Sequence, residues 1–144
     1  MFDSLFFGTA LIALTVVIQT IGLIALAGAI ARLARWFRLH LHNSGRVIAM
    51  VATVLGLFAI HTVEIWLWGA ALVFIRAAPG FADALYLSTA AFSTFGPDMS
   101  SIAPGWRLLL ALESVNGLLL IGWSIAFLVG ASTRHGPFRV GEHF

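Results

Sequence analysis

The chain has 144 residues, of which 60% are hydrophobic and only 10% are charged, and it contains no cysteine. Soluble domains carry about 45–50% apolar and about 25% charged residues, so this composition excludes a soluble globular protein. It also excludes disorder, which requires low hydrophobicity and high net charge. The formal net charge of +2 comes from scattered arginines without any lysine. Such a weak basic excess does not predict nucleic-acid binding.

Three apolar runs are long enough to cross a bilayer, which takes about 20 residues. They cover residues 5–31, 47–75 and 108–129. A fourth apolar run, 82–95, is too short to span and is typical of a re-entrant or interfacial helix. The sequence therefore predicts an all-α membrane protein with three transmembrane helices and one re-entrant helix.

The arginines are distributed unevenly around these runs. Six follow the first and third runs, and two flank the short run: Arg32, Arg35, Arg38, Arg46, Arg134 and Arg139 against Arg76 and Arg107. Cytoplasmic loops carry an excess of Lys and Arg. We therefore expect the loop after the first run and the C-terminus to be cytoplasmic, with the N-terminus outside.

The segment 80–105 has the features of a pore loop. Pro79 and Gly80 end the second run, and Asp83 is a plausible N-cap for a short helix that ends at Ser93. The Gly and Pro in the following segment, 94–98, predict a non-helical turn. The C-terminal end of a helix carries partial negative charge, which favours a nearby cation.

The residues of this segment and its flanks resemble the small bacterial two-helix potassium-channel-like family. The resemblance rests on 61–66, 84–88, 92–96, Asp98, 104–109 and 112–119. It implies a pore domain at 46–130, with outer helix 47–76, pore helix 83–93, filter 94–98 and inner helix 106–130. The remaining parts are an additional N-terminal helix with a basic cytoplasmic loop, 1–45, and a short cytoplasmic tail, 131–144.

The family resemblance implies a homotetramer around one pore in a bacterial inner membrane. Its expected function is passive conduction of monovalent cations, K⁺ and Na⁺, with no enzymatic activity. We expect no cofactor or metal beyond the permeant cations, and no partner beyond its own copies and the bilayer. The alternative is a channel-like membrane protein that does not conduct, or a subunit that needs a different partner.

The filter departs from the family pattern, because TFGPD stands in place of TVGYGD. Thr94 and Gly96 occupy the positions of the family's Thr and first Gly, whereas Phe95 and Pro97 replace Val and Tyr. The second Gly is either deleted, which keeps the inner helix in register, or replaced by Asp98. Proline fixes φ and lacks an N–H, and the missing glycine removes a residue that reaches positive φ freely. These changes predict weakened selectivity.

Three filter residues each have two interpretations. Asp98 forms either a carboxylate ring that selects and binds cations, divalent ions included, or a brace behind the loop. Thr94 either contacts the ion or caps the pore helix. Phe95 either packs behind the filter or narrows it.

Placing ionisable and polar side chains inside a bilayer costs free energy, so such residues in the apolar runs indicate functional or structural sites. His61 and Glu64 share a helix face and form either a structural pair or a pH sensor. Glu113 and Asn116 also share a face, and we expect them with Ser88 to support the filter. The other interpretation of Glu113 places it facing the pore.

Two glycines of the third run, Gly117 and Gly122, have two possible roles. They allow either a hinge in the helix or close packing against a neighbour.

Overall fold

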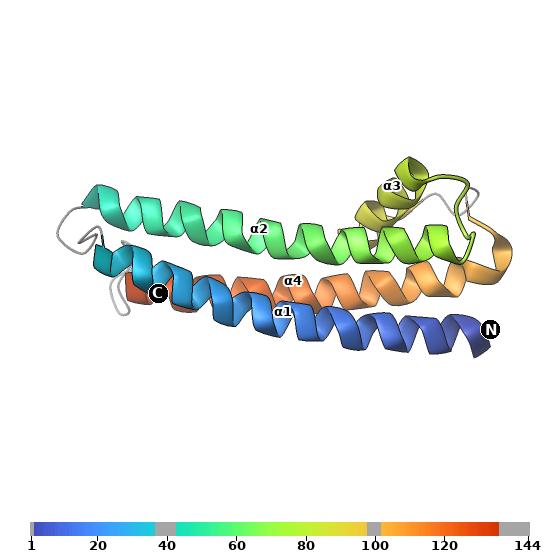
Figure 1. The fold of residues 1–144 in the computed structure, drawn as a ribbon, viewed down its shortest axis with the longest axis horizontal. Coiled ribbons are helices and arrows are strands. Elements are labelled where there is room, and N and C mark those ends of the chain that lie inside the picture. Colours follow the sequence, from blue (N-terminus) through green and yellow to red (C-terminus); the bar gives the residue numbers. More distant parts are fainter. Residues whose placement is uncertain (1, 37–42, 98–101, 136–144) are drawn as a thin grey trace. The chain divides into compact units, whose positions relative to one another are not determined.

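The structure is a computed structural model that describes residues 2–36, 43–97 and 102–135. Every regular element in these ranges is a helix (Figure 1). In chain order they are α1 (Phe2–Trp36), α2 (Asn43–Phe74), α3 (Phe81–Phe92), the short 3₁₀ turn η2 (Pro104–Trp106) and α4 (Arg107–His135).

Three of these helices are long and apolar enough to cross a membrane. The apolar segments are Phe2–Trp36, Ser44–Phe74 and Pro104–Thr133. This confirms the prediction of an all-α protein with three helices that are long and apolar enough to span a membrane. Each helix extends beyond its apolar run; α1, with 35 residues, is about 52 Å long at 1.5 Å per residue. Its ends therefore reach past a hydrocarbon core about 30 Å thick.

The chain forms two compact units, and α1, α2 and α4 each contribute residues to both. The first unit comprises residues 1–18 and 61–121, and the second comprises 19–60 and 122–144. The first unit holds α3 and the loop that follows it.

In the first unit, α1 runs parallel to α4 in a fixed register. Ser4 donates to the Gly105 carbonyl at 2.9 Å, and Asn116 Nδ2 donates to Thr15 Oγ1 at 2.9 Å. Both pairs are 101 residues apart. Because the separation is the same at two points three turns apart, the two helices advance together.

The apolar core of the first unit joins α2, α3 and α4. Trp68 and Leu72 from α2 meet Leu87 from α3 and Leu109 and Leu110 from α4, and all five side chains are buried. In a water-soluble protein, burying a large apolar side chain stabilises the fold by about 1.5–3 kcal/mol. In lipid that driving force between helices is absent, so here close packing is what stabilises the contact.

The helix α3 begins earlier than its sequence suggests. Asp83 is not the N-cap, since the helix starts at Phe81 and the cap is Gly80, with an extended backbone of φ −157° and ψ 169°. Asp83 instead lies in the first turn, where its carboxylate is near the positive end of the helix dipole. The electrostatic preference for an acid at a helix start is satisfied there as well as at the cap.

The segment that contains α3 begins and ends at neighbouring points of the backbone. After α2 the chain turns through Arg76, whose φ is 55°, and Ala77 N–H bonds back to the Leu72 carbonyl at 2.9 Å. Beyond α3, Ala103 N–H donates to the Ala77 carbonyl at 3.2 Å. The excursion that contains α3 is therefore closed by a backbone hydrogen bond at its base.

In the second unit, α1 and α2 approach through glycines. A Cβ added at Gly22 would lie 2.8 Å from Ile60 Cγ1, and one added at Gly56 would fall against Leu26. Small residues let backbones come close in membrane helices. A buried amide adds to this packing, since Gln19 Nε2 donates to Ser124 Oγ of α4 at 2.8 Å.

The closest approach in the first unit lies between α4 and the last residue of α3. A Cβ added at Gly117 would lie 2.8 Å from Phe92 Cα and 2.9 Å from Phe92 C, which are backbone atoms that cannot rotate away. A Cβ added at Gly122 would meet nothing within 4 Å. The contact favours close packing as the role of Gly117.

We therefore expect Gly117→Ala to destabilise the protein, because the added methyl forces α3 away from α4. Overpacking of this kind costs about 1–3 kcal/mol. The matched control is Gly122→Ala, which is expected to be neutral or stabilising because alanine favours helix by about 1 kcal/mol over glycine. Thermal unfolding in detergent, followed by circular dichroism, measures both. An unchanged melting temperature for Gly117→Ala would contradict the close approach.

Candidate functional site

The helix α3 lies between α2 and α4 in a consistent register. Its Ser88 contacts Ile65 and Glu113, and its Phe92 contacts His61 and lies against α4. A step of four residues forward along α3, from Ser88 to Phe92, thus corresponds to a step of four residues backward along α2, from Ile65 to His61. The two helices are antiparallel, and α3 leads inward from the end of α2.

The contacts of Phe92 give the depth that α3 reaches. His61 lies 13 residues before Phe74, the last residue of α2, which corresponds to about 20 Å along the axis. Gly117 lies 10 residues after Arg107, the first residue of α4, which corresponds to about 15 Å. The C-terminus of α3 therefore lies about 15–20 Å along α2 and α4 from the ends between which α3 is inserted.

A single hydroxyl connects the three helices at this site. Ser88 Oγ lies 2.9 Å from the Ile65 carbonyl oxygen and 2.5 Å from Glu113 Oε1. Both Ser88 and Glu113 are completely buried. The hydroxyl has one proton, so it donates to one of these oxygens at a time. Of the expected support residues, the structure thus brings Ser88 and Glu113 together behind α3.

The loop after α3 has an unusual backbone. Thr94 has φ 59° and Gly96 has φ 93°. The left-handed region is open to glycine but unfavourable for a β-branched residue. The Thr94 N–H donates to the Ala91 carbonyl at 3.0 Å, and the Gly96 N–H approaches the Ala90 carbonyl at 3.3 Å. The loop therefore curls back over the C-terminus of α3.

Most residues of the loop after α3 are exposed in the structure of a single chain. Ser93, Thr94 and Gly96 are exposed, and Phe95 is 83% exposed. Packing of Phe95 behind the loop therefore does not occur within one chain. Pro97 is partly buried, and Asp98 lies outside the described residues.

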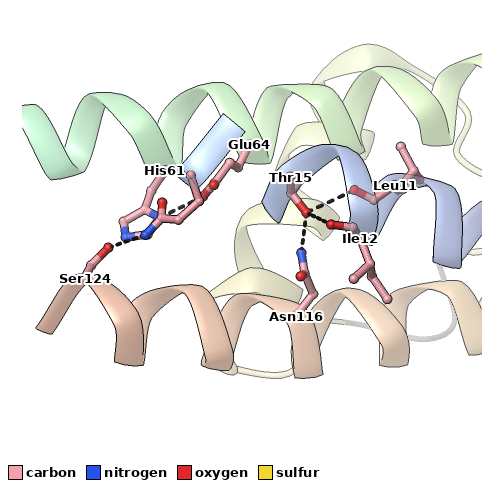
Figure 2. Close-up of polar contacts among 8 residues, drawn as sticks. Leu11, Ile12, Thr15, His61, Glu64, Asn116 and Ser124 are labelled. Carbon is pink, nitrogen blue, oxygen red and sulfur yellow. Dashed lines mark hydrogen bonds and ion pairs between the residues drawn. The ribbon is translucent and has the colours of Figure 1, made fainter. Parts of the chain in front are cut away.

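The pair of His61 and Glu64 lies directly beside the end of α3. His61 Nδ1, taken as the protonated nitrogen, donates to Glu64 Oε2 at 2.9 Å (Figure 2). Glu64 is completely buried, whereas His61 keeps 16% of its side-chain surface. The His61 ring lies 5.3 Å from the Phe92 ring. The pair thus contacts the residue from which the loop departs.

Asn116 has a different partner from the one expected. It does not join Ser88 but reaches Thr15 of α1, whose hydroxyl in turn lies within hydrogen-bond distance of the Leu11 and Ile12 carbonyls (Figure 2). Its role is to fix α1 against α4. Sequence reasoning missed Thr15 because the hydroxyl of a threonine in an apolar helix can bond a carbonyl of its own helix and therefore does not indicate a partner on another helix.

Three buried polar atoms in the described part of the first unit have no hydrogen-bond partner there. They are Glu64 Oε1, Trp68 Nε1 and Glu113 Oε2. Such atoms in a native protein are usually satisfied by water or a neighbouring chain. Within the described ranges, no three His, Asp or Glu side chains come together as a metal site.

No family model matches this chain, and no characterised protein or solved structure is similar enough to indicate a relationship. Function must therefore be inferred from the residues and geometry of α3 and its loop.

Replacing Ser88 tests the junction of the three helices. We expect Ser88→Ala to destabilise the protein by about 1–3 kcal/mol, because Glu113 Oε1 loses its donor in a buried site. Glu113→Gln keeps an acceptor oxygen and should cost less. Ser114→Ala is the control, since that hydroxyl bonds only the Leu110 carbonyl of its own helix at 3.1 Å. Equal melting temperatures for Ser88→Ala and Ser114→Ala would show that Ser88 does not hold α3.

A double-mutant cycle tests the attachment of α1. Thr15→Val and Asn116→Ala each remove one partner of the bond, and the double variant removes both. Side-chain hydrogen bonds between membrane helices contribute about 0.6 kcal/mol on average and up to about 1.7 kcal/mol. We expect a coupling energy in that range from unfolding in detergent. Strictly additive effects would mean that the two side chains act independently.

Proposed function

We propose that this protein is a homotetrameric cation channel in which α3 is a re-entrant pore helix and 94–98 is the filter. The observation that carries this proposal is exposed, non-helical backbone at the C-terminal end of α3, about 15–20 Å along α2 and α4 from the ends between which α3 is inserted. Ser93, Thr94, Phe95 and Gly96 follow the inner end of α3 and are all exposed within one chain.

Lipid cannot cover this loop. Irregular backbone at membrane depth is tolerated only where protein buries it or water fills the space beside it. The described part of one chain leaves the loop uncovered, so other copies or a water-filled path must surround it. Four copies around one axis satisfy both conditions, with the loops at the centre and a path between them.

The charges and dipoles near the loop favour a cation. The C-terminus of α3 directs partial negative charge toward the middle of the membrane. Glu64 and Glu113 are the acidic residues of the neighbouring spans, and Arg76 and Arg107 lie at or beyond the far ends of those spans. A ring of four Asp98 carboxylates at the mouth would add a site that attracts cations, divalent ions included.

Selectivity between K⁺ and Na⁺ is expected to be weak. Carbonyl selection requires rings of backbone oxygens that replace the hydration shell. Here the loop turns back at Thr94 and Gly96, and Pro97 supplies no N–H. The charge at the mouth of the proposed pore then affects which ions permeate more than the size of the ion does.

The same loop geometry supports a second candidate function. Its N–H groups cap α3 at Ala90 and Ala91, so the loop is not extended along an axis. A protein with this loop is also suited to be a non-conducting, channel-like subunit. Ion flux separates the two candidates.

The proposed location is a bacterial inner membrane, with the N-terminus outside and the C-terminus in the cytoplasm. The support is the arginine excess between α1 and α2 and after α4. A reporter fused after Phe144 should be active on the cytoplasmic side only.

Flux from liposomes containing purified protein tests the proposed channel. We expect K⁺ and Na⁺ to permeate with little preference, and divalent cations to block. Asp98→Asn should remove the divalent block and lower conductance, because the carboxylate ring loses its charge. Native mass spectrometry should give a tetramer for both proteins. No flux from an intact tetramer would favour the non-conducting subunit.

Strong K⁺ preference that Asp98→Asn leaves unchanged would show instead that a carbonyl ladder forms. If Glu113→Gln keeps the tetramer but changes ion preference strongly, then Glu113 faces the pore.

A further inference from the structure

A cavity in the second unit lies outside α3 and its loop. Its volume is about 580 Å³. It is lined mainly by small and apolar side chains from three helices, among them Ala27, Ala31, Thr53, Phe127, Gly130 and Thr133. A volume of this size is in the range of small-molecule sites in proteins, about 300–1,000 Å³.

The cavity offers little to a polar ligand. The protons of its two threonine hydroxyls are already donated, since Thr53 donates to the Ala49 carbonyl at 2.8 Å and Thr133 donates to the Gly130 carbonyl at 3.0 Å. The lining therefore fits a hydrocarbon.

Arginines continue the same helix faces toward the membrane surface. Ala27, Ala31 and Arg35 follow one another at four-residue spacing on α1, which places them on one ridge. Arg46 precedes Thr53 by seven residues, or two turns, on α2. Ala27 and Arg35 are separated by about 12 Å along the axis. This is close to one leaflet of hydrocarbon, which is about 15 Å thick.

The sequence of the second unit is strongly basic. Segments 19–60 and 122–144 contain six of the eight arginines and one acidic residue, Glu142. Arg35 is exposed and Arg46 is partly exposed, so both side chains can meet a ligand from the bilayer. A mainly apolar cavity, with arginines one or two turns further along the same helix faces, has the polarity of a phospholipid with an anionic headgroup.

We propose that the second unit binds one anionic diacyl phospholipid. One acyl chain fills the cavity between Ala27 and Gly130, and the phosphate lies at Arg35 and Arg46. The proposal does not depend on ion conduction, because none of these residues belongs to α3 or its loop.

Lipid retention by the full-length protein tests the site. Purified protein is incubated with phosphatidylglycerol or phosphatidylcholine in detergent, and bound lipid is counted by native mass spectrometry. We expect one phosphatidylglycerol per chain to be retained in preference to phosphatidylcholine. Glycerol 3-phosphate, which has the headgroup chemistry without acyl chains, should not displace it. Displacement by glycerol 3-phosphate would overturn the role of the cavity.

Two variants address the two parts of the site separately. Arg35→Gln should weaken retention about fivefold, the contribution of one arginine near an anionic surface. Gly130→Leu should weaken it by more than about tenfold, because the added side chain replaces several buried methylenes of the acyl chain. A Cβ at Gly130 meets nothing within 4 Å, so the leucine enters open space without displacing a helix.

Matched controls distinguish a site from general attraction. Arg107→Gln removes the same charge outside the second unit. Gly122→Leu makes the same change at another open position of α4. Both should retain phosphatidylglycerol like the original protein. Equal losses in Arg35→Gln and Arg107→Gln, or full retention in Gly130→Leu, would overturn the proposal.

A cross-linking experiment needs no variant. Phosphatidylglycerol with a photoactivatable diazirine in one acyl chain should label peptides around Ala27–Ala31 and Phe127–Gly130. Labelling confined to the outward faces of the helices would refute a specific cavity site. Protein–protein cross-links through these peptides, without lipid labelling, would show that a second copy fills the cavity.

Discussion

The position of α3 depends on the Ser88 hydroxyl, which lies between the Ile65 carbonyl and Glu113. This contact is buried, so losing one partner leaves a desolvated polar group that nothing else satisfies. It sets how far α3 enters between α2 and α4. The contact of Phe92 with Gly117 and the exposure of the loop after it follow from that depth.

The additional helix α1 is integrated by polar contacts and close packing. Apolar surfaces alone give little preference for a neighbouring helix over lipid. Ser4, Thr15 and Gln19 are buried and bond α4 or the turn before it. Because the first two contacts share one register, α1 is held at a fixed height against α4. The first helix is thus part of the helical core and not only an anchor.

Sequence reasoning succeeded where one physical requirement dominates. Apolar length alone identified the three long helices, because a bilayer needs about 20 residues to be crossed. It failed at ends such as the start of α3, where Gly80 and Asp83 both suit a helix terminus. It anticipated the Ser88–Glu113 contact, because a buried carboxyl needs a donor, but not Thr15–Asn116. The expected Asp98 ring and tetramer stay predictions, because they concern an assembly, which the fold of one chain does not determine.

The backbone hydrogen bond from Ala103 to Ala77 has a consequence for how the sequence of such a protein can evolve. The excursion between these residues begins and ends at the same point, so its length and sequence can vary while α2 and α4 keep their spacing. The loop after α3 can therefore gain or lose a residue without a compensating change in α2 and α4. A change of length in the TFGPD segment is the kind of variation that this closed base tolerates.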